Sequence, residues 1–537
     1  MVIKKVLILF LIANIGLLEA QYTAIPDNNF EQILINQGID SDGIINGQVL
    51  TSDINVITFL NLDGEYTMSV ISDLTGIEDF TALEELNCRY NLLTELHLEN
   101  NIALKILDCS INIELIALNL SQNINLEYLN CSYLGNNLSS ITIDFSNNVK
   151  LEYLQADNSS FNNLDLANNI NLKTLRCSND TYDDFGLENN IINLNLSNNT
   201  KLEYLECYNT NLENILLPNT DTLTYINLGY QNLSTINVSY NTKLENLILP
   251  LNYNLSTLDI ASNHNLKLLN VNKCNLTLLD VSQNLQLEQL HIGYLWRNNL
   301  LIEPNFNNNI QNIDISHNIN LKSLNVRRIN LNSLDITNNI NLILLNTEKN
   351  NLSSLDLINN LQLKRLNINE NPIQTLDLVN NTNLEFLSCE LTSLNSLNLN
   401  NNNNDILNNV YARNNPNLNC IEVDNEMDAN NNIGFYINWQ KDATTIYSED
   451  CTAINSIRDE LKPNISLYPN PTEIILFINS QNNINIKYIK VFNMLGQQLI
   501  FKEGNISQLN FGNLKPALYL VKIKTETEII TTKILKK

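Results

Sequence analysis

A unit of about 21 residues recurs along most of the 537-residue chain, and this repeat restricts the possible folds more than any other feature of the sequence. One half of the unit has the pattern L-[DN]-L-S-x-N, as in residues 118–123 and 194–199. The same pattern begins at Leu334, Leu355, Leu376 and Leu397, with a step of 21 residues each time. The other half has the pattern L-x-x-L-x-[C/V/I/T], as in residues 83–88, 104–109, 202–207 and 384–389. The full unit occurs roughly fourteen times, so the repeat predicts an array rather than one globular core.

The spacing of apolar residues predicts how one unit folds. Leu, Ile and Val alternate with polar residues, which indicates two short strand-like segments per coil. One coil cannot bury its apolar face alone, but stacked coils with parallel strands about 4.8 Å apart can, giving an array about 65 Å long. Asparagine makes up roughly a fifth of the sequence, far above ordinary composition. Its amide both donates and accepts hydrogen bonds, and it tolerates left-handed backbone, so we expect Asn to satisfy the turns between coils.

These two patterns resemble the leucine-rich-repeat family, in particular the short bacterial 21-residue class that includes internalin-like proteins with stacked cysteines. The resemblance covers residues 83–415 and implies a repeat solenoid, a horseshoe with a parallel β-sheet along one face. Extra residues at 132–142, 178–190 and 293–312 lengthen single coils and must loop out of the stack. Loops often carry function, although these could also be tolerated surface insertions.

Both flanks of the array are expected to cap its apolar ends. In the N-terminal cap (residues 21–82), residues 25–35 predict an amphipathic helix capped by Asp27, with Phe30, Ile33 and Leu34 on one side. The C-terminal cap (residues 416–451) contains Trp439. Both stretches resemble the flanks of secreted repeat proteins of the Bacteroidetes. A calcium site near Asp40 and Asp42 is an alternative to an Asx-rich turn there, but the spacing does not fit an EF-hand loop.

The nine cysteines fall into two groups. Most occupy the repeated inward position, where they are expected to be small buried apolar residues with free thiols, because parallel side chains give poor disulfide torsions; these are Cys88, Cys109, Cys131, Cys177, Cys207 and Cys389, with Cys274 slightly out of register. Cys420 and Cys451 lie outside the array, and in an exported protein we expect them to form a disulfide that staples the cap. A zinc site is the competing interpretation, but no C-x-x-C spacing supports it.

The two ends of the chain predict export. Residues 1–20 combine Lys4 and Lys5, a short apolar run and a small residue at Ala20, which is typical of a secretory signal cleaved near Ala20. After a linker at residues 452–464, residues 465–537 alternate as a small β-sandwich. The motifs at 468–471, 491–496, 518–522 and 532–537 resemble the type A sorting domain of the type IX secretion system. The resemblance implies contact with that machinery, transport across the outer membrane, and release or attachment at the cell surface.

Charge and motif content narrow the function. The formal net charge is −26, and phosphate would be repelled, so nucleic acid is not an expected partner. None of the four His lies in a nucleophile motif, and no phosphate-binding loop, metal set or cofactor motif is present, so catalysis is not expected. We expect a binding module for a protein or cell-surface ligand, with a polysaccharide ligand or a purely structural spacer as alternatives. Beyond the signal, no segment approaches transmembrane length.

The predicted recognition surface lies two residues after each inward position, which we expect to face outward from the sheet. Aromatic residues and Arg at this position favour a ligand surface over a bland spacer. The tyrosines could instead stack on one another for stability. The predicted ligand-binding residues are Tyr90, Tyr133, Tyr230, Tyr294 and Arg328, with Trp296, Arg297 and Arg327 close by in sequence, and Lys273 and Lys349 share the position.

Overall fold

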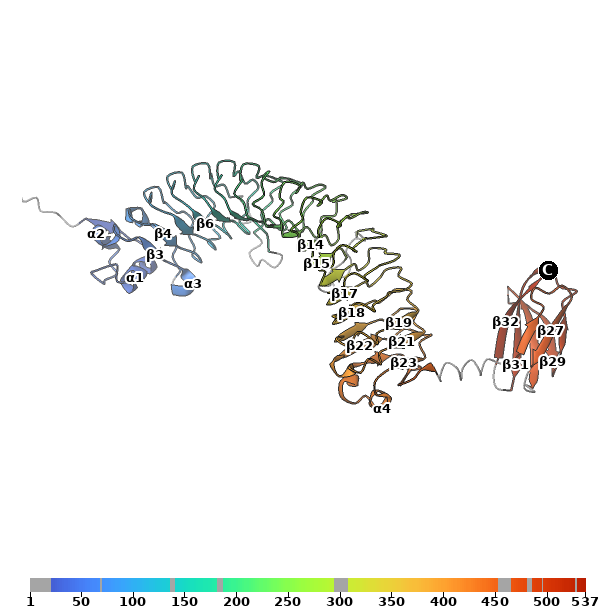
Figure 1. The fold of residues 1–537 in the computed structure, drawn as a ribbon. Helices are drawn as coiled ribbons and strands as arrows, with labels where there is room; N and C mark the ends of the chain where they lie inside the picture. Colours follow the sequence, from blue (N-terminus) through green and yellow to red (C-terminus); the bar gives the residue numbers. More distant parts are fainter. Residues whose placement is uncertain are drawn as a thin grey trace, which may run out of the picture. The chain divides into compact units, whose positions relative to one another are not determined.

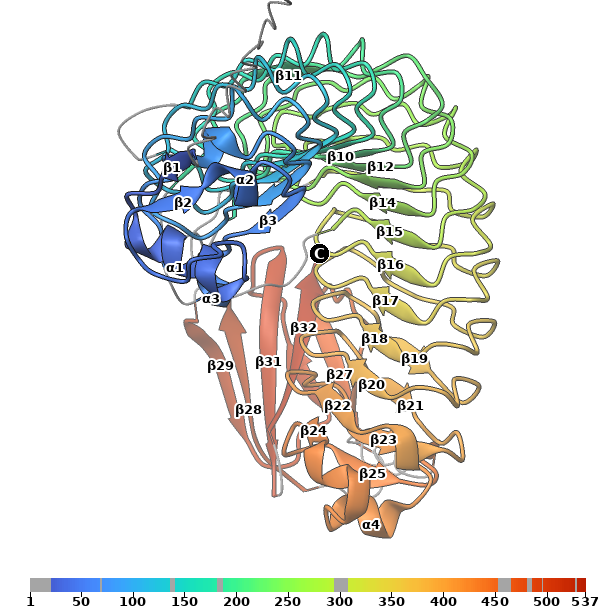
Figure 2. The ribbon, with the colours of Figure 1, turned by 90° about the vertical axis from the view of Figure 1, so that its left-hand side faces the viewer.

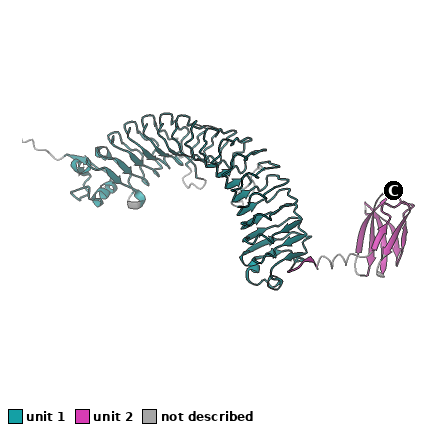
Figure 3. Cartoon of the chain, viewed as in Figure 1, with its two compact units in different colours: residues 1–447 teal, residues 448–537 magenta. Residues whose placement is uncertain are grey.

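The computed structural model describes residues 21–67, 70–135, 141–180, 187–293, 308–452, 465–480, 485–494, 496–526 and 529–537. The chain divides into two compact units, residues 1–447 and 448–537 (Figure 3). The predicted signal, residues 1–20, and most of the predicted linker lie outside the described residues.

The first unit is a curved solenoid with one parallel sheet along its inner edge (Figures 1 and 2). Each central Leu or Ile of a strand points inward, as Leu107, Leu129 and Leu345 do, with at most 2% of the side chain exposed. Adjacent strands pair in register, for example Leu107 with Leu129. The predicted solenoid with a continuous parallel sheet along one face is therefore confirmed. The strands of this main sheet, in order, are β3 (Phe59–Asn61), β4 (Glu85–Asn87), β5 (Ile106–Asp108), β6 (Tyr128–Asn130), β7 (Tyr153–Gln155), β8 (Thr174–Arg176), β10 (Tyr204–Glu206), β12 (Tyr225–Asn227), β13 (Asn246–Ile248), β14 (Leu268–Asn270), β15 (Gln289–His291), β16 (Ser323–Asn325), β17 (Leu344–Asn346), β18 (Arg365–Asn367), β20 (Phe386–Ser388), β22 (Asn409–Ala412) and β24 (Gln440–Lys441).

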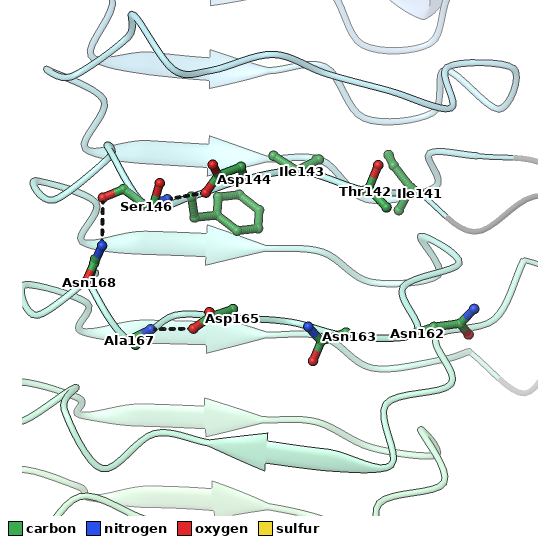
Figure 4. A pocket seen from close by; sticks show the side chains of 11 residues that line it. Ile141, Thr142, Ile143, Asp144, Ser146, Asn162, Asn163, Asp165, Ala167 and Asn168 are labelled. Carbon is green, nitrogen blue, oxygen red and sulfur yellow. Dashed lines mark hydrogen bonds between the residues drawn. The ribbon is translucent and has the colours of Figure 1, made fainter.

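The second half of each coil is extended but forms a strand only in places. Two short sheets run there, both built on parallel pairs. One is β9 (Asn193–Asn195) with β11 (Asn214–Leu216), and the other is β19 (Thr375–Asp377), β21 (Ser396–Asn398) and β23 (Cys420–Glu422), with β25 (Ile446–Ser448) beside β23. Figure 4 shows this side of two coils, where Asp144 and Asp165 each accept a hydrogen bond from a backbone N–H two residues later. Asx turns of this kind close the coil after its Asp, so the predicted second strand is in most coils replaced by an extended segment and a turn.

Buried asparagines connect each coil to the one before it, as the composition predicted. In the middle of the array, the amide nitrogen of Asn339 donates to the carbonyl oxygens of Ile315 and Asn318, at 3.0 and 2.9 Å. The next residue of the row, Asn360, donates to Asn339 in turn, at 2.9 Å. Each carbonyl also accepts a backbone N–H within its own turn, so the asparagine supplies the second hydrogen bond that links it to the next coil. The row consists of Asn101, Asn123, Asn148, Asn169, Asn199, Asn241, Asn263, Asn284, Asn318, Asn339, Asn360 and Asn381.

The N-terminal end of the array is closed by a small cap. Asp27 accepts hydrogen bonds from the backbone of Asn29 and Phe30 and so caps the predicted helix, whose Phe30, Ile33 and Leu34 are buried. The cap elements are β1 (Tyr22–Ala24), α1 (Asn28–Asn36), β2 (Gln48–Leu50), α2 (Thr51–Ile54), α3 (Gly64–Thr67) and η1 (Ile77–Asp79).

The segment after this helix is an Asx-rich turn. Asp40 accepts from the backbone of Asp42, and Asp42 accepts from the backbone of Ile44 and the side chain of Asn46. Burial raises the pKa of the Asp40 carboxyl. Over the described residues, no group of three or more His, Cys, Asp or Glu is placed to hold a metal ion.

Aromatic residues close the other end of the array. Trp439 is 6% exposed, packs edge-on against Tyr436, and donates its indole N–H to the carbonyl of Leu407 at 2.8 Å. The short elements there are η2 (Asn404–Ile406), α4 (Glu426–Asn430) and η3 (Gly434–Asn438). The last coil thus buries its apolar face under this cap.

The second unit is a small antiparallel β-sandwich. Strands β26 (Ile465–Tyr468), β27 (Ile475–Ser480) and β30 (Gln508–Asn510) form one sheet, and β28 (Ile486–Asn493), β29 (Gln498–Glu503), β31 (Ala517–Thr525) and β32 (Ile529–Lys536) form the other. Its core includes Leu476, Ile489, Phe511, Val521 and Ile534. The unit buries its own core, as the alternating pattern predicted.

The cysteines differ from expectation at one pair. Cys177 and Cys207, predicted to be free, form a disulfide between neighbouring coils. Coil stacking brings their Cα atoms to 4.8 Å, within the range that a disulfide spans, and the argument from parallel side chains was too strict. The buried Cys88, Cys109, Cys131, Cys274 and Cys389 are free thiols, and Cys420 and Cys451 are disulfide-bonded.

Thiol labelling of the denatured, unreduced protein is expected to modify these five free cysteines and to spare Cys177, Cys207, Cys420 and Cys451. Peptide mapping should find Cys420 joined to Cys451. Labelling of either member of that pair without reductant would rule out the staple across the C-terminal cap.

Candidate binding surface

The inner face of the main sheet is built from the residues on either side of each buried central Leu or Ile. Side chains alternate along a strand, so in β6 the buried Leu129 is flanked by the half-buried Tyr128 and Asn130, which face away from the core. In-register pairing then places equivalent residues of successive coils side by side. This face therefore carries rows of side chains that run along the solenoid.

One row carries four tyrosines, which we call the tyrosine ladder: Tyr128, Tyr153, Tyr204 and Tyr225. The rings of Tyr128 and Tyr153 stack with centroids 4.5 Å apart and planes 9° apart. The rings of Tyr204 and Tyr225 stack at 4.4 Å and 2°. Partial burial raises the pKa of Tyr128 to about 12, so its hydroxyl stays protonated at neutral pH.

Charged groups lie beside the tyrosine ladder. The guanidinium of Arg176 lies 3.5 Å from a carboxylate oxygen of Asp157 and 3.4 Å from one of Glu206. The hydroxyl of Tyr204 donates to the same Glu206 oxygen at 2.9 Å. Burial raises the pKa of Asp157, opposed by a hydrogen bond from the backbone N–H of Ser178. The arrangement holds Arg176 in a fixed position on an otherwise acidic stretch of the sheet.

A second region of the same face, across β15 to β22, forms a concavity with a volume of about 560 Å³. We call it the C-terminal hollow. The Arg365 guanidinium lies 4.6 Å from the centre of the Phe386 ring, and that ring lies 5.7 Å from Tyr411. Leu344 is 39% exposed beside them. At the edge of the C-terminal hollow, Arg413 pairs with Glu390 at 2.7 Å. Burial lowers the pKa of His291, which favours its neutral imidazole. Apolar, aromatic and guanidinium groups therefore meet in one concave region.

The predicted ligand-binding residues lie elsewhere, at a turn after each strand. Tyr90, Tyr133, Tyr230 and Arg328 all have left-handed backbone, with φ between 56° and 60°. Tyr90 and Tyr230 are 45% and 41% exposed, and Arg328 is exposed too. We expected strand alternation to turn these side chains outward. That reason was wrong, because side chains two residues apart lie on the same face of a strand. The side chains leave the core because the chain turns at these residues. Lys273 and Lys349 have the same left-handed backbone conformation, but Lys273 is buried.

Among the predicted ligand-binding residues near the insertion at 293–312, Arg327 is buried. Arg327 is 7% exposed and pairs with the buried Glu348 at 2.7 Å, so it belongs to the scaffold rather than to a ligand surface. Tyr294, Trp296 and Arg297 lie outside the described residues.

The residues that do line the inner face were present in the repeat pattern. In Leu-Glu-Tyr-Leu at 202–205 and Leu-Glu-Phe-Leu at 384–387, the aromatic residue directly precedes a buried Leu. Simple alternation places such a residue outward, and the same rule finds Tyr128, Tyr153 and Tyr225.

Over the described residues, no helix is long and apolar enough to cross a membrane. Residues 466–537 match the family described as the secretion system C-terminal sorting domain. This match confirms the prediction that the C-terminal unit is a type IX sorting domain.

The chain is similar in fold to the functional domain of InlJ from Listeria monocytogenes, a structure whose name states that it includes a cysteine ladder. The TM-score is 0.57 at 21% identity, covering 96% of this chain and 99% of that chain. A leucine-rich-repeat protein from Leptospira interrogans gives a TM-score of 0.49 at 18% identity, covering 73% of this chain and 97% of that chain. The first similarity confirms the leucine-rich-repeat fold. No curated protein matches the chain.

Proposed function

We propose that this leucine-rich-repeat protein, exported by type IX secretion, binds another protein through the inner face of its main sheet, at the cell surface or after release. The observation that carries the proposal is the C-terminal hollow, where Leu344, Arg365, Phe386 and Tyr411 meet in a concavity of about 560 Å³. Aromatic residues and Arg dominate the energy of protein interfaces, and central concave pockets are where they act.

The composition of the hollow also argues against a purely structural spacer. Leu344 is 39% exposed, and the Phe386 ring is covered on one side by a guanidinium rather than by core residues. An exposed apolar cluster on a charged, soluble surface generally marks an interaction site. A spacer would not require these side chains in adjacent coils.

A double variant tests the proposal. The chain from residue 21 onward is screened against an array of extracellular proteins and glycans, and each ligand found is titrated against R365A/F386A. We expect each truncation to cost about 1 kcal/mol or more, so binding should weaken at least about tenfold while the melting temperature stays nearly constant.

The matched control is I340A/L361A, since Ile340 and Leu361 are 53% and 46% exposed at a turn after the buried Asn row. This control should bind as the unmodified chain does. Equal binding by both double variants would refute the inner face as the binding surface, and ligands that are all glycans would favour the accessory glycan-binding alternative.

The exposed turn residues remain part of the proposal as a second contact region. Alanine replacement of Arg328 or Trp296 in the same titration would show whether the ligand extends to the turns beside the third insertion.

A further inference from the structure

The tyrosine ladder is interrupted at one position. Strand β8 pairs with β7 on one side and with β10 on the other, and Thr174 is in register with both Tyr153 and Tyr204. The outer faces of these two rings do not meet another ring, because their stacking partners Tyr128 and Tyr225 lie on the opposite sides. The ladder is thus two tyrosine pairs separated by one small residue, which we call the Thr174 gap.

Strand spacing fixes the width of the Thr174 gap. Two steps of about 4.8 Å separate the Tyr153 and Tyr204 positions, so a flat group above Thr174 would lie about 4.8 Å from each ring. The tyrosine pairs themselves stack at 4.4 and 4.5 Å, which shows that this spacing is a contact distance for planar groups on this face. It is also within the range of about 6 Å over which a cation is attracted to an aromatic ring.

The charge around the Thr174 gap favours a cation. Arg176 is already compensated by Asp157 and Glu206, and Lys173 pairs with Glu152 at 2.7 Å. Glu203, the residue before β10, adds a further carboxylate near Lys173, so acidic groups outnumber basic ones. The chain as a whole carries a net charge of −26, which attracts basic partners from a distance.

We propose that the Thr174 gap takes an arginine side chain of the protein partner, with its guanidinium stacked between the rings of Tyr153 and Tyr204. A guanidinium is planar, weakly hydrated and stacks on aromatic faces, whereas an ammonium is a compact, strongly hydrated charge. Glu206, two residues after Tyr204, pairs with Arg176 and accepts from the Tyr204 hydroxyl, and so adds negative charge beside the gap. This inference rests on the proposed function and names the chemistry of one contact at a place separate from the C-terminal hollow.

The test fills the gap with the residue that the ladder lacks. Thr174→Tyr should complete the stack without disturbing the strand, because Tyr occupies the same register position in four other coils. The probe is a Gly-Ser-Gly-Arg-Gly-Ser-Gly peptide, titrated by calorimetry against the chain from residue 21 onward. Its citrulline counterpart removes the charge but keeps the shape.

Two ring contacts at partly exposed sites are together worth about a tenfold change in dissociation constant, so Thr174→Tyr and the citrulline peptide should each weaken binding about tenfold. Asn246→Tyr is the matched control, because Asn246 is in register with Tyr225 and adds a ring outside the gap. It should bind the arginine peptide as the unmodified chain does. Tyr204→Leu, which removes one wall, should weaken binding as Thr174→Tyr does.

Equal affinity of Thr174→Tyr and the unmodified chain for the arginine peptide would overturn the inference. Binding of an uncharged oligosaccharide such as chitotriose in place of the peptide, with loss in Thr174→Tyr, would overturn the assigned chemistry. Neither outcome bears on R365A/F386A, so failure here is distinguishable from failure of the proposed function.

Discussion

Replacing Asn339 with Ala is expected to destabilise the middle of the array by about 2–4 kcal/mol. The side chain is fully buried, and its amide nitrogen donates to two carbonyl oxygens of the preceding coil. Alanine removes both donors, so each carbonyl keeps only the backbone N–H bond from its own turn, and water cannot replace the lost bonds without opening the stack. Hydrogen exchange of amides in the flanking coils measures the effect locally, because long repeat arrays do not unfold in a single step.

The neighbouring residue is the control. The amide of Asn338 also donates to a carbonyl of the preceding coil, that of Ser316 at 3.3 Å, but Asn338 is exposed. Since water can replace this bond, Asn338→Ala should change stability by no more than about 0.5 kcal/mol. If the two variants are equally stable, the buried Asn row does not hold the coils together.

Arg327→Met is expected to destabilise the protein by about 3–5 kcal/mol, because it leaves the carboxylate of Glu348 buried without its ion-pair partner. The side chains of Arg327 and Glu348 are only 8% and 10% exposed, and their nitrogen and oxygen atoms lie 2.7 Å apart. Asn367 also donates to Glu348, at 2.9 Å, but a neutral amide does not compensate a buried charge. Hydrogen exchange of amides in the coils of β16 and β17 measures the loss locally.

An exposed ion pair at the other end of strand β16 provides the comparison. Lys322 and Glu288 lie 2.8 Å apart with 51% and 40% of their side chains exposed. Lys322→Met should therefore change stability by less than about 1 kcal/mol. If Arg327→Met is as stable as the unmodified protein but loses ligand binding, Arg327 contacts the ligand and does not serve the scaffold.

The fold could be predicted because every coil repeats the same physical requirement. Leucines at fixed spacing need a stacked neighbour, and an Asn in each turn supplies donors to the coil before it, so one correct unit determines the array. The caps were predictable for the same reason: Asp27 precedes an amphipathic run, and Trp439 follows the last coil.

The binding surface was harder to predict because it depends on where the backbone leaves the strand. Tyr90 and Arg328 adopt a left-handed backbone conformation that the sequence pattern does not encode, since Ile111 and Leu391 adopt it as well. The C-terminal hollow arises from side-chain sizes in several coils at once, and no single unit shows it. The Cys177–Cys207 bond depends on a spacing of 4.8 Å between Cα atoms of residues 30 apart in sequence, across an insertion.

Hydroxyl-radical footprinting tests most directly whether the inner face binds a partner. It is done with a ligand found in the screen of extracellular proteins and glycans. The method reports solvent access of individual Tyr, Phe and Leu side chains. If the inner face binds the ligand, Phe386, Tyr411 and Leu344 are protected while Ile340 and Leu361 react as in the free protein. Protection of Ile340 and Leu361 with unchanged reactivity of Phe386 and Tyr411 would contradict it.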